Sequence, residues 1–177
     1  MNCRPDRLIV GYTTEFLPGG ITVAQQIRSF VEDTAGCPTT MASDAVPEAL
    51  KTLGARRIAI VTPYLPAEDQ NVEDYFNTLG FSVATVAGLQ VPRTRLLGTA
   101  QFSEGQVRNT FARMDEAEID ALVQIGTNLV CPGFAADLET RHGKPVIAVN
   151  TATYWLALRN HGISDRLEDH GVLLAHH

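Results

Sequence analysis

Long apolar runs are absent from this sequence. The longest ones, such as 8–10 and 58–61, fall far short of the roughly 20 residues that a membrane-spanning helix needs. No charged stretch followed by an apolar one opens the chain, as it would in a secretory leader. We therefore expect a cytoplasmic protein that does not bind a membrane. Its 45% of hydrophobic residues are enough to bury a core.

Cysteine and positive charge are also scarce. The three cysteines, Cys3, Cys37 and Cys131, are far apart and form no CxxC pair, which argues against a disulfide framework and a thiolate metal site. The 14 Lys and Arg residues are scattered and are outnumbered by 20 Asp and Glu residues, so the net charge is -6. A groove for nucleic acid needs clustered basic residues. We expect no nucleic-acid partner.

Motifs that bind cofactors are missing as well. The sequence contains no GxGxxG and no glycine-rich loop with a lysine, so nothing indicates a nucleotide cofactor. Its five histidines lie between His142 and the C-terminus, without the pairing of a metal site. We expect a protein that works without cofactor or metal.

What the sequence does contain is a repeated alternation of short β-branched runs with helical patterns. Apolar residues at helical spacing follow the runs, for example Val23, Ile27 and Phe30 after the first one. This alternation predicts an α/β fold of mostly parallel sheets with helices on both faces. The expected strands are 8–10, 57–61, 81–86, 121–125 and 145–149. Three of the expected helices have caps at Thr22, Ser103 and Asn150, and two more cover 45–53 and 72–79.

Polar loops follow three of the expected strands, at 12–14, 62–64 and 126–128. Ligands of parallel sheets bind beyond the carboxyl ends of the strands, so these loops are the candidate site. Their hydroxyls and free backbone amides can hold a carboxylate or stabilise an enolate-like charge. The alternative is that Thr and Asn only cap the helices that follow.

A long connection from Ala87 to Phe102 has no clear periodicity and is a candidate cover for the site. It contains Arg93 and Arg95, the densest basic stretch of the chain. The two arginines belong either to a solvated loop or to a lid that attracts anions.

Four segments, in order along nearly the whole chain, carry a family resemblance. They are 11–20 (GYTTEFLPGG), 53–64 (LGARRIAIVTPY), 120–129 (DALVQIGTNL) and 144–155, which starts KPVI and ends ATYW. Together they resemble the aspartate/glutamate racemase superfamily, and most closely its maleate cis-trans isomerase and arylmalonate decarboxylase branch.

The resemblance implies two similar subdomains around a cleft. We expect residues 1–44 plus 146–177 to form the first subdomain and residues 45–145 the second. Family members generally carry a further strand and helix before the loop at 11–20, so the first subdomain is short at its start. An incomplete gene model is one explanation. A sheet edge left unpaired there would favour a homodimer.

The resemblance also implies a site for a small carboxylate. In the family, one or two cysteines act beside a carboxylate that is held by hydroxyls, loop amides and a tyrosine. By this analogy the catalytic residues are Thr13, Tyr64 and Thr127. The substrate-binding residues would be Gly11, Tyr12, Thr14, Gly126 and Asn128.

The cysteine positions are where this sequence departs from the family. Gly11, or Tyr12 after a shift of one residue, stands at the first position, and Gly126 stands at the second. Cys131 lies five residues further on. Because threonine hydroxyls need a partner base, Glu15 is either that base or a solvated carboxylate at a helix entry.

The leading hypothesis is a cofactor-independent isomerase or racemase that resembles maleate cis-trans isomerase and acts on a small mono- or dicarboxylate. The first alternative is a lyase similar to arylmalonate decarboxylase. The second is a degenerate carboxylate-binding protein that has lost the chemistry, which the glycines at the cysteine positions favour.

Overall fold

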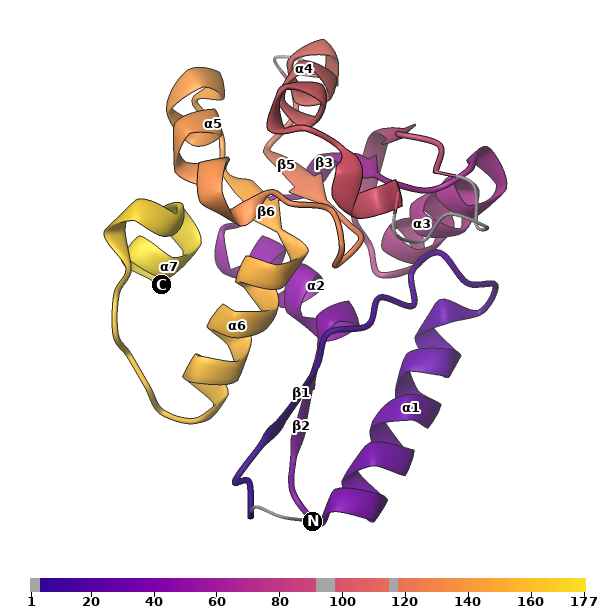
Figure 1. Cartoon of the computed structure of the whole chain (residues 1–177), viewed down its shortest axis with the longest axis vertical. Helices are drawn as coiled ribbons and strands as arrows, with labels where there is room; N and C mark the ends of the chain where they lie inside the picture. The colour runs from indigo at the N-terminus through magenta and orange to yellow at the C-terminus, as the bar shows by residue number, and fades with distance from the viewer. Residues whose placement is uncertain (1–3, 92–97, 115–117) are drawn as a thin grey trace.

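Parallel strands form two sheets in the computed structural model, which describes residues 4–91, 98–114 and 118–177 (Figure 1). The larger sheet has the order β4-β3-β5-β6, and the smaller one pairs β1 with β2. The strands are β1 (Leu8–Val10), β2 (Thr39–Met41), β3 (Arg57–Thr62), β4 (Ser82–Gly88), β5 (Ala121–Gln124) and β6 (Val146–Ala148).

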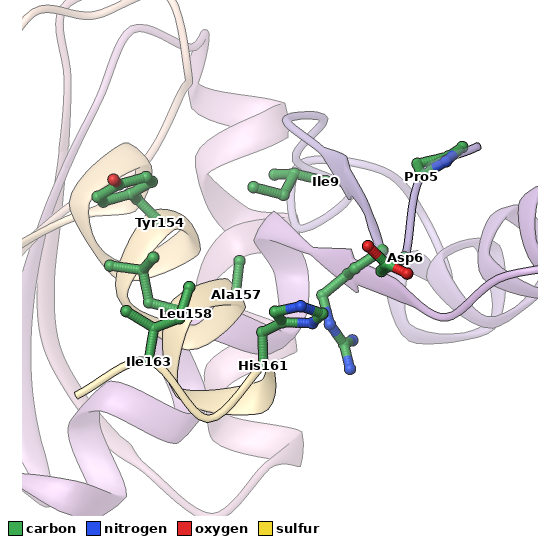
Figure 2. A pocket seen from close by; sticks show the side chains of 9 residues that line it. Pro5, Asp6, Ile9, Tyr154, Ala157, Leu158, His161 and Ile163 are labelled. Carbon is green, nitrogen blue, oxygen red and sulfur yellow. The ribbon is translucent and has the colours of Figure 1, made fainter. Parts of the chain in front are cut away.

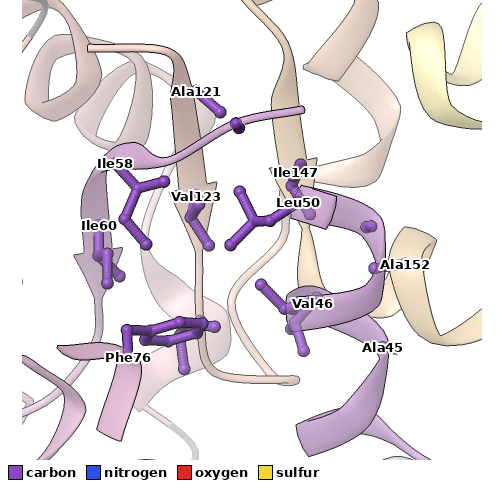
Figure 3. Packing of buried hydrophobic residues seen from close by; sticks show 14 of the residues in the cluster. Ala45, Val46, Leu50, Ile58, Ile60, Phe76, Ala121, Val123, Ile147 and Ala152 are labelled. Carbon is purple, nitrogen blue, oxygen red and sulfur yellow. The ribbon is translucent and has the colours of Figure 1, made fainter. Parts of the chain in front are cut away.

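Helices cover both faces of the larger sheet. Successive strand residues point to opposite sides, and both sides carry apolar residues that the helices bury. On one face, Ile58, Val123 and Ile147 pack in a cluster with residues of α2, α3, α6 and α7 (Figure 3). On the other face, Ala59 and Leu122 pack with residues of α4 and α5. The helices are α1 (Gly20–Ala35), α2 (Ala42–Thr52), α3 (Pro66–Thr78), α4 (Glu104–Met114), α5 (Ala135–His142), α6 (Val149–Asn160) and α7 (Val172–His176).

The α/β fold with parallel sheets between helices is confirmed, and several helix ends are corrected. Ser103 caps α4 together with Gln106, as expected. In contrast, α1 begins at Gly20, after Gly19 in a left-handed conformation, and not with a cap at Thr22. Asn150 lies inside the first turn of α6 and does not cap it. Strand β2 was not expected, because its residues Thr-Thr-Met form too short a run.

Two similar subdomains are not what the chain forms. It folds as a single domain in which β6 pairs with β5 in the larger sheet. Helices α2 and α6 pack along each other and share one buried cluster, with Ala45 and Trp155 among its members. Among the described residues, the smaller sheet consists of β1 and β2. The boundaries 1–44 plus 146–177 and 45–145 stay a prediction.

Part of the candidate lid lies outside the described residues. β4 extends to Gly88, into the connection expected from Ala87 onward, and Arg93 and Arg95 fall in the segment that is not described. Their role stays a prediction. Across the described ranges, none of the helices has the length and apolar character that crossing a membrane requires.

Candidate functional site

Three polar loops follow the carboxyl ends of β1, β3 and β5. We call them loop A (11–19), loop B (63–65) and loop C (125–131). Loops A and B are joined by a hydrogen bond of 2.8 Å between the hydroxyls of Thr13 and Tyr64. The ring of Phe16 packs against that of Tyr64, with 4.8 Å between their centroids. The side-chain amide of Asn71 on α3 donates to the Phe16 carbonyl at 2.9 Å, which fixes loop A further.

Loop C reaches the same point through Gly126. This residue has a φ of 101°, a backbone conformation that residues other than glycine rarely adopt. A β-carbon built on it would lie 2.7 Å from Cγ and Cδ of Pro63 and 3.6 Å from the Tyr64 hydroxyl oxygen. Loop C therefore lies directly against loop B, beside the bond between Tyr64 and Thr13.

The other predicted site residues are placed around this meeting point with different exposure. Gly11 is exposed, with open space where a side chain would begin. Tyr12 is 45% exposed, and the hydroxyl of the buried Thr14 has no hydrogen-bond partner among the residues that the structure describes. In loop C, Thr127 is partly exposed and Asn128 is exposed. The structure thus brings together Thr13, Tyr64 and Gly126, whereas the side chains of Thr127 and Asn128 make no described contact with loops A and B.

Tyr64 is a hydrogen-bond donor at neutral pH. Burial raises the pKa of its hydroxyl above the ordinary value of a tyrosine, and the hydrogen bond with Thr13 opposes this only in part. A protonated tyrosine held by a neighbouring hydroxyl is a suitable partner for a carboxylate oxygen.

Glu15 is not the solvated carboxylate that was one of the two interpretations of its position. Its side chain is fully buried, and within the described part of the chain neither carboxylate oxygen has a hydrogen bond of normal geometry. Burial raises the pKa of Glu15 to about 7, although the nearby backbone amides of Glu15 and Thr14 lower it in part; the carboxylate of Asp44 raises it slightly. At neutral pH the acid and its conjugate base are therefore both populated, as proton transfer requires.

Cys131 does not belong to the site. It is buried in the cluster between the sheet and helices α4 and α5. Burial raises the pKa of its thiol to about 12, so almost none of it is the reactive thiolate at neutral pH.

We expect Cys131 to resist alkylation in the folded chain. Iodoacetamide at pH 8 should modify the half-buried Cys37 first and Cys131 only after unfolding in urea, because access and thiolate character both control the rate. Peptide mapping by mass spectrometry measures both sites in one sample. Equally fast modification of the two cysteines in the native chain would contradict this assignment.

Two residues that the sequence analysis did not assign to the site support loop C. The side-chain amide of Gln124 donates to the carbonyl of Gly126 at 2.7 Å, and that of Asn150 donates to the carbonyl of Thr127 at 2.9 Å. Gln124 is fully buried at the end of the apolar strand β5. A single polar amide in an otherwise apolar strand was the feature of the sequence that could have indicated this supporting role.

A separate hollow of about 270 Å³ lies between the start of β1 and α6 (Figure 2). Ile9, Tyr154 and Leu158 contribute its apolar lining. Pro5, Asp6 and Arg7, which precede β1, also line it, whereas loop A follows β1. This hollow is therefore distinct from the candidate site. Among the described residues, no group of three His, Cys, Asp or Glu side chains is placed to hold a metal ion.

Comparison with known proteins gives a consistent result. Maleate isomerase of Pseudomonas putida is 28% identical over 84% of this chain, which spans 59% of that relative's length. The crystal structure of a variant of the maleate isomerase Iso from Pseudomonas putida S16 with maleate superposes with a TM-score of 0.87 at 25% identity, covering 97% of this chain and 70% of that one. A crystal structure of arylmalonate decarboxylase has the same fold, with a TM-score of 0.82 at 20% identity over 96% of this chain and 75% of that one.

Residues 9–174, nearly the whole chain, match the arylmalonate decarboxylase family. The resemblance seen in four segments of the sequence is thereby confirmed. The chain belongs to the arylmalonate decarboxylase family.

Proposed function

We propose that the chain binds a small carboxylate where loops A, B and C meet, and that it acts on this ligand as a cofactor-independent isomerase. The observation that carries the proposal is the hydrogen bond between Thr13 and Tyr64 beside Gly126. It gathers two hydroxyls from distant parts of the chain at the carboxyl ends of parallel strands, where ligands of such sheets bind. Maleate, present in the structure of the Pseudomonas putida S16 enzyme, is the first ligand to test.

The residues divide into carboxylate holders and a proton carrier. Tyr64, Thr13 and Thr127 supply hydroxyls to the carboxylate, and the backbone around Gly126 approaches it closely because that residue has no side chain. Positions 11 and 126 are glycine, and the thiol of Cys131, the last residue of loop C, is buried in the core and does not face the point where the loops meet. Glu15, whose pKa lies near neutrality, is the candidate base.

Removing single hydroxyls tests the binding site. Tyr64→Phe and Thr127→Ala should each weaken maleate binding by roughly 10-fold, because a hydrogen bond to a charged group contributes about 1.5–3 kcal/mol. Isothermal titration calorimetry of the two variants and the parent chain measures this directly. Tyr154→Phe, at an exposed tyrosine on α6, is the matched control and should bind as the parent does. Unchanged affinity in both site variants would refute the proposal.

A carboxylate-binding protein without activity is the second candidate, favoured by the buried Cys131 and the glycine at 126. Proton NMR of maleate incubated with the chain distinguishes the two, because an isomerase converts maleate to fumarate. Release of carbon dioxide from an arylmalonate would instead indicate the lyase. Binding without turnover of either compound would support the second candidate. The homodimer and the cytoplasmic location remain predictions.

A further inference from the structure

Loop C is held by side-chain amides that the proposed function does not use. The carbonyl of Gly126 accepts two hydrogen bonds from within the fold, one from the Gln124 side chain at 2.7 Å and one from the backbone amide of Leu129 at 3.0 Å. The donors are fixed, since Gln124 and Leu129 are both fully buried. This carbonyl therefore points into the protein.

The orientation of that carbonyl determines the orientation of the next amide. In a trans peptide the C=O and the N–H point in opposite directions, and the described chain has no cis peptide. The N–H of Thr127 therefore points away from Gln124 and the core. Thr127 is itself partly exposed, so its amide faces the open side of the loop.

The next peptide, between Thr127 and Asn128, is fixed in the same way by a side chain of another element. The side-chain amide of Asn150, in the first turn of α6, donates to the carbonyl of Thr127 at 2.9 Å. The N–H of Asn128 consequently points away from α6. Two consecutive peptides are thus oriented by two side chains, one from β5 and one from α6.

The outward amides have no partner within the described part of the chain. Neither the N–H of Thr127 nor that of Asn128 donates to a backbone or side-chain acceptor there. Adjacent backbone amides that the fold leaves free can bind anionic oxygens. Gly126, next to them, lies within reach of the Tyr64 hydroxyl.

We propose that Gln124 and Asn150 are positioning residues, which hold the carbonyls of Gly126 and Thr127 so that the amides of Thr127 and Asn128 face the ligand. This inference rests on the proposed function, because the ligand is the carboxylate bound where the three loops meet. The two residues act through the backbone and do not touch the ligand. Each one controls a different amide.

Nitrogen-15 NMR of the full chain titrated with maleate tests the inference residue by residue. In the parent chain the amide signals of Thr127 and Asn128 should shift on binding. Gln124→Met, which keeps the volume but loses the donor, should abolish the shift of Thr127. Asn150→Ala should abolish the shift of Asn128 and should weaken binding by about 5-fold, as expected for the loss of one aligned hydrogen bond. Asn160→Ala, at an exposed position in the last turn of α6, is the control and should change neither signal.

The outcomes separate this inference from the proposed function. A purely structural role would lower the stability of the variants but leave the two amides responding to maleate, and that result would overturn the inference. Shifts confined to loop A in the parent chain would overturn it as well, while leaving the carboxylate site intact. If no amide of the parent chain responds to maleate, malonate or aspartate, the proposed function fails. Asn150 is exposed, so its variant decides the question even if Gln124→Met does not fold.

Discussion

Replacing Gly126 by alanine is expected to lower the free energy of unfolding by about 2–5 kcal/mol, because left-handed backbone strain costs about 1–2 kcal/mol and overpacking about 1–3 kcal/mol. The φ of 101° disfavours any side chain, and the added carbon would lie 2.7 Å from two ring atoms of Pro63. Neither contact is relieved by a simple rotation, since the proline ring is tied to the backbone. Urea denaturation followed by circular dichroism measures the change.

The control for this substitution is Gly11→Ala at the end of β1. Gly11 has open space around the position of a β-carbon and no left-handed φ, so its variant should remain within about 0.5 kcal/mol of the parent. Equal stability of the Gly126 and Gly11 variants would contradict the close approach of loops B and C.

These two glycines have a consequence for the chemistry of the site. The resemblance implies cysteine at position 126 and at position 11, or at position 12 after a shift of one residue. Of the two glycines, only Gly11 has room for a side chain. A thiol can therefore be introduced at position 11 without displacing neighbouring atoms, whereas at position 126 it would push against Pro63. The absence of a thiol at position 126 therefore follows from how loop C packs against loop B.

Strands β3, β5 and β6 of the larger sheet were predictable because both of their faces are buried. Their β-branched runs, such as the one in β3 with Ile58, Ile60 and Val61, contain little else than apolar residues. β2 could not be found in this way, since its Thr39 and Thr40 are polar and become buried only in the folded chain, where β2 pairs with β1 and contacts α1, α2 and α6. Pairing between distant segments is not visible in local composition.

The site was predictable in its loops but not in its electrostatics. The rule that ligands bind at the carboxyl ends of parallel strands placed Thr13, Tyr64 and Gly126 in three loops, and the structure brings these loops together. Nothing in the sequence showed that Glu15 is buried, because a glutamate between a threonine and a phenylalanine is equally compatible with a surface turn. Its environment comes from helices α2 and α3, which lie far away along the chain.

Glu15→Gln is expected to remove the part of the pH dependence of stability that comes from Glu15. The pKa of Glu15 is raised from an unfolded value of 4.5 to about 7, so the folded chain binds this proton more tightly than the unfolded chain does. The resulting stabilisation is complete below pH 4.5 and is lost as the pH rises through 7. By linkage the difference amounts to about 3 kcal/mol, because above pH 7 the backbone amides of Glu15 and Thr14 offset the cost of burying the charge only in part.

The measurement is urea denaturation of the parent chain and the Glu15→Gln variant at pH 5, 6, 7 and 8. Relative to the parent, the variant should gain about 2–3 kcal/mol between pH 5 and pH 8, because it carries no group that must ionise in the core. The groups that face Glu15, namely Asp44 on α2, Tyr64 after β3 and Tyr75 on α3, are present in both chains, so their titration largely cancels in the comparison. Glu118→Gln, at an exposed glutamate, should leave the pH profile unchanged. A constant difference between parent and Glu15→Gln from pH 5 to pH 8 would mean that Glu15 reaches solvent, and its role as the base of the site would then lose its physical support.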